Sequence, residues 1–96
     1  MKYKEYKDAS NRQVVALDGC SRFTSKYIRW RIVRKFSLTK SEKLFDDLDS
    51  VSNKYCKQQE TVLIEWDTWS GLTVTAVDSL SEKLVLEIGG FVKKFT

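Results

Sequence analysis

The alternation of hydrophobic and polar residues is clearest between Thr61 and Asp78, where two runs of β-branched and aromatic residues flank the pair Ser70–Gly71. Two such runs joined by a short glycine-containing turn are typical of a β-hairpin. In the first run, one side of the strand carries Val62, Ile64, Trp66 and Thr68, and the other carries Leu63, Glu65, Asp67 and Trp69. Because successive side chains of a strand point to opposite faces, the pattern predicts a buried Trp66 and an exposed Trp69.

The segment 25–36, SKYIRWRIVRKF, also alternates and is predicted to form a long strand. Its expected buried residues are Ile28, Trp30 and Ile32, and its expected outward residues are Tyr27, Arg29, Arg31 and Val33. A shorter strand is predicted over 13–18, because the β-branched pair Val14–Val15 precedes the turn-forming pair Asp18–Gly19. Residues 1–12 show no clear pattern and are treated as a flexible N-terminal segment.

Two further segments favour helices. Thr39 and Glu42 have the spacing of a capping box, and a helix is predicted over 40–57. Its expected buried stripe is Leu44, Phe45, Leu48, Val51, Tyr55 and Cys56. Ser79 and Glu82 repeat the capping-box spacing before a second stripe, Leu80, Leu84, Ile88, Phe91, Val92 and Phe95. Gly89–Gly90 would weaken this helix, because glycine costs about 1 kcal/mol relative to alanine in a helix interior.

The tetrapeptide SEKL occurs at 41–44 and again at 81–84, so both predicted helices begin with the same residues. This echo is compatible with a repeat of strand, strand and helix, although the Ser70–Gly71 turn has no counterpart in the first half. With 96 residues, of which 42% are hydrophobic, the chain can close one modest core. We therefore expect a single α+β domain over 1–96, with an antiparallel sheet of about four strands, two helices on one face and the order ββαββα.

Charge divides the chain unevenly. The net charge is +4, but residues 1–40 hold eleven basic and three acidic side chains, whereas residues 41–96 hold six basic and ten acidic ones. The first part therefore carries +8 and the second −4. A basic chain is a candidate for an anionic partner, but this polarity also allows the two parts to neutralise one another.

The residue types argue against several kinds of chemistry. Histidine is absent and only two cysteines are present, so neither a closed zinc site nor another metal site is expected. Cys20 has no histidine that could activate it, and Cys56 is expected to be a small core residue, both as reduced thiols. We expect no catalytic residue and no cofactor. Without a hydrophobic run of membrane-spanning or signal-peptide length, the chain is expected to be cytoplasmic and without a membrane partner.

The strongest functional candidate is the basic cluster of 25–36, in which Tyr27 and Trp30 are interleaved with arginine and lysine. Aromatic rings among cations on a sheet are typical of single-stranded nucleic-acid binding. The competing interpretation is structural, because Glu65 and Asp67 would pair with Arg29 and Arg31 across neighbouring strands.

We expect a small non-enzymatic binding protein that acts through protein–protein contacts, as an adaptor, an inhibitor or a neutralising partner. Its partner would be another protein or a second copy of the chain, and nucleic acid is the second choice. Trp69 is expected to be an exposed anchor, because tryptophan and arginine dominate interface energies. The predicted binding residues are Tyr27, Arg29, Arg31, Lys35, Glu65, Asp67 and Trp69.

Overall fold

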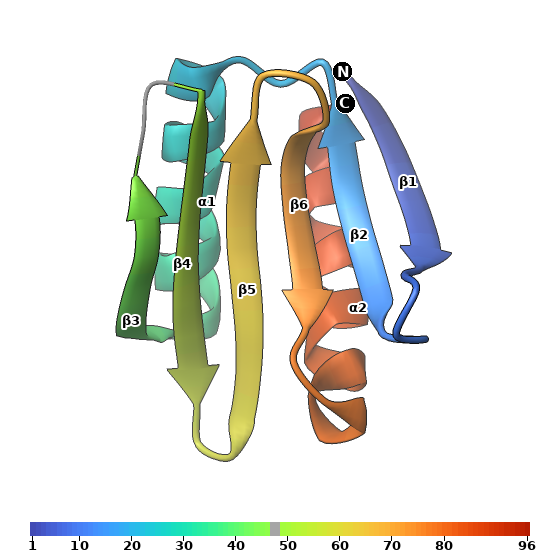
Figure 1. Cartoon of the computed structure of the whole chain (residues 1–96), viewed down its shortest axis with the longest axis vertical. Coiled ribbons are helices and arrows are strands. Elements are labelled where there is room, and N and C mark those ends of the chain that lie inside the picture. The colour runs from blue at the N-terminus through green and yellow to red at the C-terminus, as the bar shows by residue number, and fades with distance from the viewer. Residues whose placement is uncertain (47–48) are drawn as a thin grey trace.

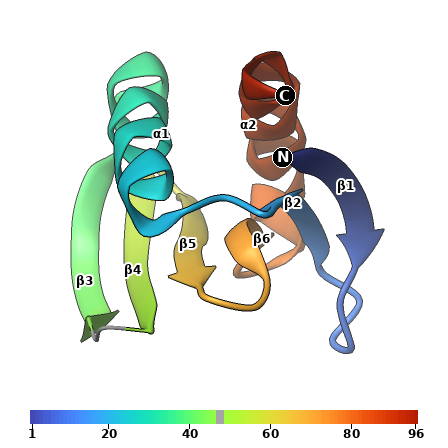
Figure 2. The ribbon, with the colours of Figure 1, turned by 90° about the horizontal axis from the view of Figure 1, so that it is seen from above.

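A computed structural model describes residues 1–46 and 49–96, and within them six strands form one antiparallel sheet with two α-helices packed on the same face (Figures 1 and 2). The strands are β1 (Lys2–Lys7), β2 (Gln13–Asp18), β3 (Thr39–Asp46), β4 (Ser50–Lys57), β5 (Glu60–Asp67) and β6 (Gly71–Ala76). The helices are α1 (Arg22–Phe36) and α2 (Glu82–Val92), and short 3-10 turns η1 (Ser79–Ser81) and η2 (Lys93–Phe95) flank α2. The order across the sheet is β1-β2-β6-β5-β4-β3.

This architecture corrects the predicted fold. The class is α+β, but the described residues form six strands rather than about four, and the order along the chain is ββαββββα rather than ββαββα. Two segments differ from the prediction: 25–36 lies in helix α1 instead of a strand, and the segment predicted as a helix over 40–57 contains the strands β3 and β4. SEKL lies in β3 in its first copy and spans η1 and α2 in its second, so the echo is not a structural repeat.

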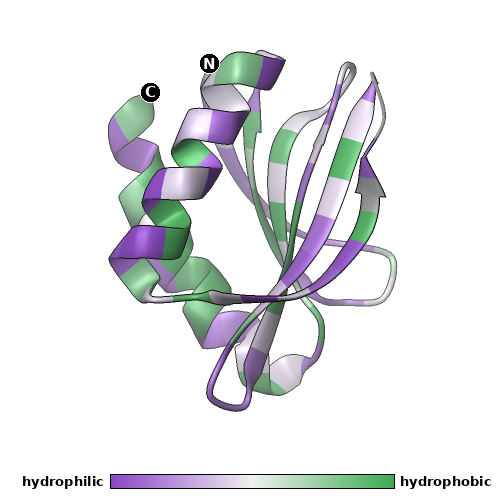
Figure 3. Ribbon diagram, turned by 90° about the vertical axis from the view of Figure 1, so that its left-hand side faces the viewer, coloured by the Kyte–Doolittle hydropathy of each residue, from purple (hydrophilic) through white to green (hydrophobic). Residues whose placement is uncertain are grey.

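The central hairpin of β5 and β6 is confirmed. Ile64 pairs with Val74 and Trp66 with Leu72, and all four side chains are buried beneath the helices. The indole N–H of Trp66 donates to the backbone oxygen of Cys20 at 2.7 Å, which satisfies its polar atom inside the core. Figure 3 shows the alternation of hydrophobic and hydrophilic residues along the strands. The register places Trp66 in the core, as predicted.

The strand predicted over 25–36 is wrong because its spacing also fits a helix. Ile28 and Ile32 are four residues apart, so they share one face of a helix as well as one face of a strand, and both are fully buried. Trp30 lies on the opposite side of α1 and is 53% exposed. The helix begins at the N-cap Ser21, whose hydroxyl accepts the Thr24 N–H at 3.2 Å, and it ends at Ser37 in the left-handed conformation.

The helix predicted over 40–57 is wrong because bulges hide the alternation of a strand. The pairing of β3 with β4 shifts between Lys40 and Glu42 and again between Lys43 and Phe45, so β3 shows no regular period of two. In β4, Asn53 and Tyr55 face the helices and are buried, which places a polar residue in the core. Leu48 and the side chain of Phe45 lie outside the part that the structure describes.

The N-terminal segment is β1 rather than a flexible arm, and it pairs along its length with β2, which confirms the strand predicted over 13–18. Asp8 stabilises the turn between them, because its Oδ1 accepts the N–H groups of Ser10 and Arg12, both at 2.9 Å. Tyr3 of β1 pairs with Leu17 near the end of β2, and its side chain packs against α2 at Gly89.

Helix α2 continues through Gly89 and Gly90. A Cβ atom on Gly89 would overlap the hydroxyl of Tyr3 and a methyl group of Val15, so this glycine lets α2 approach β1 and β2 closely. The predicted Ser79 cap is replaced by Asp78, which caps the 3-10 turn η1 before α2 by accepting the Ser81 N–H on its Oδ1 at 3.0 Å. The N-cap of α2 itself is Ser81, which makes no side-chain capping hydrogen bond. Leu84, Ile88 and Val92 form the buried stripe.

Candidate functional site

A row of exposed aromatic residues runs along the outer side of α1. Phe23, Tyr27 and Trp30 are 86%, 51% and 53% exposed, and their i, i+4 and i+7 spacing places them on one helix face. Arg34 continues the row by one turn. Because Ile28 and Ile32 occupy the inner side, α1 is hydrophobic on both faces, whereas a helix at the surface of a monomer usually has a polar outer side.

The same helix is strongly basic. Its fifteen residues, RFTSKYIRWRIVRKF, include six arginines and lysines and no acidic residue. Arg31 donates to the Tyr27 hydroxyl at 2.7 Å, and its guanidinium group lies 5.7 to 5.8 Å from the ring centres of Tyr27, Phe91 and Phe95. Arg31 thereby joins α1 to the C-terminal end of α2 through contacts between a cation and aromatic rings.

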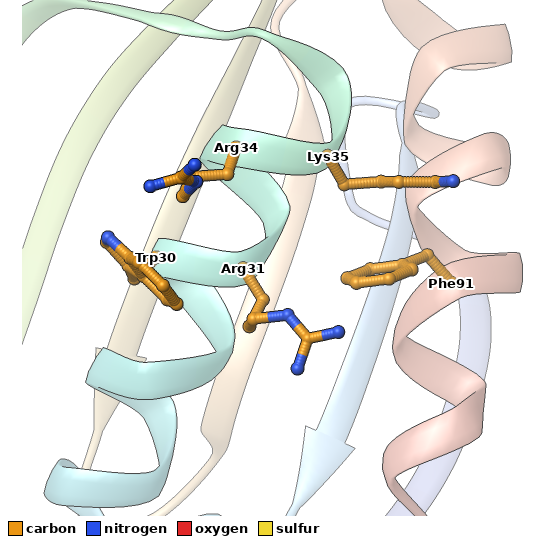
Figure 4. A pocket seen from close by; sticks show the side chains of 5 residues that line it. All are labelled: Trp30, Arg31, Arg34, Lys35 and Phe91. Atoms are coloured by element: carbon orange, nitrogen blue, oxygen red, sulfur yellow. The ribbon is translucent and has the colours of Figure 1, made fainter.

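Together these residues form one aromatic–basic surface, which consists of Phe23, Tyr27, Trp30, Arg31, Arg34, Lys35, Phe91, Lys94 and Phe95. Arg34 lies 5.2 Å from the centre of the Trp30 ring, and Lys94 lies 6.0 Å from that of Phe91. Trp30, Arg31, Arg34, Lys35 and Phe91 surround a shallow hollow of about 440 Å³ between the two helices (Figure 4).

The predicted ion pairs between the sheet and the basic cluster do not form. Glu65 and Asp67 lie on the face of the sheet that the helices leave open, whereas α1 covers the opposite face. Glu65 accepts a hydrogen bond from the Ser52 hydroxyl at 2.9 Å. Asp67 has a structural role, because its Oδ1 accepts the N–H groups of Trp69 and Ser70 in the turn between β5 and β6.

Within the described residues, none of the ion pairs involves Lys26, Arg29, Arg31, Arg34 or Lys35. Arg22 at the start of α1 pairs with Asp46 at 3.2 Å, and other acidic side chains pair with cations outside α1. Lys4 pairs with Asp18 at 2.6 Å, and Lys7 pairs with Glu82 at 2.9 Å. The structure therefore leaves most of the positive charge of α1 available to an external partner.

Arg29 lies on the flank of α1 that faces β4, away from the row of aromatic residues. It borders a small hollow of about 80 Å³ together with Lys26 and Asp46, and its charge acts on the buried Tyr55.

Desolvation would raise the pKa of Asp46, but the nearby charges of Lys43 and Arg22 outweigh it and hold that pKa below its usual range. Arg22 donates to Asp46 at 3.2 Å.

Trp69 belongs to a second, separate surface. It is 83% exposed, as predicted, in the turn between β5 and β6. There it borders a hollow of about 430 Å³ together with Lys4, Tyr6 and Asp18 on the open side of the sheet. The seven predicted binding residues are thus divided, with Tyr27, Arg29, Arg31 and Lys35 on α1 and with Glu65, Asp67 and Trp69 on the open side.

The prediction missed Phe23 and Phe91, and it left Trp30 and Arg34 out of the predicted binding residues although both belong to the basic cluster of 25–36. The sequence did contain a signal for three of them, because Phe23, Trp30 and Arg34 lie with Tyr27 at helical spacing. Reading the segment as a strand placed Trp30 in the core and separated it from its neighbours. Phe91 reaches the same surface only because α2 packs beside α1, which no local pattern reports.

The two thiols are not bridged to one another. Cys20 is buried, and desolvation raises the pKa of its thiol, which disfavours the nucleophilic thiolate. Within residues 1–46 and 49–96, no three metal-ligating side chains cluster together. In the same residues, no helix is long and apolar enough to cross a membrane.

Comparisons with protein-family models, with curated proteins and with solved structures find no match for this chain.

Proposed function

We propose that this chain is a small non-enzymatic binding protein that acts on another protein through direct contact, as an adaptor, an inhibitor or a neutralising partner. The observation that carries this proposal is the exposure of Phe23, Tyr27 and Trp30 on a helix whose cations are largely without acidic partners. Exposed aromatic residues that lie together are uncommon on monomers and typically mark an interaction surface. The partner surface would be acidic, because it must complement α1.

The composition of the surface favours a protein partner. Tryptophan, tyrosine and arginine are the residues that contribute most to interface energies. Arg31 and Arg34 already lie against aromatic rings, so part of each ring that a nucleic-acid base would stack on is covered by a guanidinium group. Such preordered pairs lose little conformational entropy when a protein partner covers them.

The edges of the sheet favour the helical layer as the docking surface. The edge strand β1 has the sequence KYKEYK, and the edge strand β3 is bulged at two places. Lysines and bulges at an edge disfavour the addition of a strand from another chain. A partner that bound by extending the sheet would meet both obstacles.

Nucleic acid is the second candidate, and one observation favours it specifically. Helix α1 carries six cations and no acidic residue, and three exposed aromatic rings lie among these cations. A single strand would use the cations for phosphates and the rings for stacking. Its binding would weaken steeply with added salt, because phosphate contacts release counterions.

Capture from a native lysate, with and without nuclease, separates the two candidates. The bait proteins are the wild type, Trp30→Ala and the matched control Trp69→Ala, which removes an exposed tryptophan from the other surface. We expect the wild type and Trp69→Ala to capture a protein partner, also after nuclease treatment, and Trp30→Ala to fail to capture it. With the purified partner, Trp30→Ala should weaken binding by about 2 kcal/mol, roughly thirtyfold.

Two results would contradict the proposal. If nuclease removes everything that the wild type captures, nucleic acid becomes the leading candidate. If Trp69→Ala abolishes association while Trp30→Ala leaves it intact, the open side of the sheet is the docking surface instead. Sedimentation of the free chain shows whether the partner is a second copy, in which case Trp30→Ala should lower the self-association.

A further inference from the structure

The hollow between α1 and α2 differs from the rest of the aromatic–basic surface in the chemistry of its walls. Trp30 and Phe91 border it with aromatic rings, and Arg31, Arg34 and Lys35 border it with cations. Figure 4 shows Arg31 between the two rings, with Arg34 beside Trp30 and Lys35 beside Phe91. Among residues 1–46 and 49–96, no acidic side chain lines the hollow.

One cation of this hollow, Arg31, is held in place by several contacts. The guanidinium group of Arg31 contacts the rings of Tyr27, Phe91 and Phe95, and it donates a hydrogen bond to the Tyr27 hydroxyl. Phe91 is in turn fixed by edge-to-face contacts with Phe36 and Phe95, at ring separations of 6.0 and 5.5 Å. A preordered guanidinium group binds an anion with a smaller entropic cost than a free one.

The cations of α1 do not form one continuous track. Arg31, Arg34 and Lys35 surround the hollow that faces α2, whereas Lys26 and Arg29 border the hollow that faces β3 and β4, where Asp46 already supplies negative charge. A nucleic-acid backbone needs cations along its whole path. A cluster around one hollow suits a single anionic side chain better.

We propose that this hollow receives an acidic side chain of the protein partner, with its carboxylate on Arg31, Arg34 and Lys35 and its methylene groups against Trp30 and Phe91. The inference rests on the proposed function and names the chemistry of the partner's anchor. A glutamate matches the hollow because it joins an apolar stem to a group that arginine binds with two parallel hydrogen bonds. The volume of about 440 Å³ accommodates such a side chain together with neighbouring residues of the partner segment.

The test uses the indole N–H signals of the three tryptophans in a nitrogen-15 NMR spectrum. The Trp66 N–H is bonded inside the core and Trp69 lies on the other surface, so both serve as internal controls. The probes are polyglutamate, a Gly–Ser peptide of the same length and an oligothymidylate of the same charge as the polyglutamate. We expect polyglutamate to shift the Trp30 signal alone and the Gly–Ser peptide to shift none.

Variants that remove cations test whether the shift of the Trp30 signal comes from polyglutamate bound in the hollow. Arg34→Gln with Lys35→Gln removes two exposed cations from its rim and should weaken polyglutamate binding tenfold or more, because charge-assisted hydrogen bonds are lost. Lys2→Gln with Lys54→Gln makes the same change in net charge on the open side of the sheet, opposite the helices, and should weaken binding by less than about threefold. Equal melting temperatures show that both double variants are folded.

Three outcomes would overturn the inference. Equal losses in the two double variants would mean that only net charge matters. A tighter complex with oligothymidylate, dependent on Arg34 and Lys35, would assign the hollow to phosphate and would favour nucleic acid. If polyglutamate leaves Trp30 unchanged while a partner still depends on Trp30, the carboxylate anchor is wrong and the proposed function stands.

Discussion

The pair Gly89 and Gly90 gives the sharpest test of how α2 meets the sheet, because two adjacent glycines have opposite surroundings. Replacing glycine by alanine within a helix normally stabilises a protein by about 0.5 to 1 kcal/mol. At Gly90 a Cβ atom would meet no atom within 4 Å, so Gly90→Ala should show that gain. At Gly89 the new methyl group would overlap Tyr3 and would lie 2.8 Å from Cγ1 of Val15.

Inserting a methyl group into a packed contact costs about 1 to 3 kcal/mol. Since the helix-propensity gain is common to both positions, the free energy of unfolding of Gly89→Ala should be about 1 to 3 kcal/mol lower than that of Gly90→Ala. Tyr3→Phe removes the hydroxyl that the new methyl group meets, so it should recover part of the loss in the double variant with Gly89→Ala.

The measurement is urea unfolding at 25 °C, followed by tryptophan fluorescence, for the wild type, both alanine variants and the Tyr3→Phe combinations. Equal slopes against urea across the series would show that the free energies are comparable. If Gly89→Ala stabilises the protein as much as Gly90→Ala does, the close approach of α2 to β1 and β2 is refuted.

Two further predictions test α1 and the β1–β2 edge. Ile28→Ala should lower the free energy of unfolding by about 2 to 5 kcal/mol, whereas Trp30→Ala should change it by less than about 1 kcal/mol. Urea unfolding measures both values, and similar losses for Ile28→Ala and Trp30→Ala would contradict the helix and favour a strand in this segment. A hydrogen bond from Lys7 and one from the backbone N–H of Gln13 lower the pKa of Glu82 in the folded protein. The ionised Glu82 carboxylate therefore stabilises the fold at pH values above the pKa that Glu82 has in the unfolded chain, and this stabilisation is lost as the pH falls through its folded-state pKa. The difference in melting temperature between wild type and Glu82→Gln should therefore shrink below about pH 5, and a constant difference from pH 7 to pH 3 would contradict this assignment.

Sequence patterns identified the elements whose signal is local. The hairpin of β5 and β6 could be predicted because strict alternation and a glycine turn specify both the strands and the register. The register correctly placed Trp66 in the core and Trp69 in solvent. The basic and aromatic character of the segment that forms α1 was also visible, because it depends only on the residue types.

The segments 25–36 and 40–57 were assigned wrongly because their patterns of hydrophobic residues do not separate a helix from a strand. Ile28 and Ile32 share a face in a strand and in a helix, and only the position of Trp30 separates the two. In β3 the bulges break the alternation. In β4 the polar Asn53 occupies a buried, inward-facing position where alternation would lead one to expect a hydrophobic residue. In α1 and in the two strands the tertiary structure decided which pattern holds, because the packing of the helices on the sheet determines the buried side of each element.

The candidate site depended still more on tertiary structure. The sequence by itself determined that a cluster of arginine, lysine and aromatic side chains exists, and that the chain carries more basic than acidic residues. Only the fold decided that Glu65 and Asp67 lie across the sheet from this cluster, and that Phe91 lies beside it. Ion pairs and hollows are formed by residues that are far apart in the chain. The local periodicity of a sequence does not show which of these residues come together in the fold.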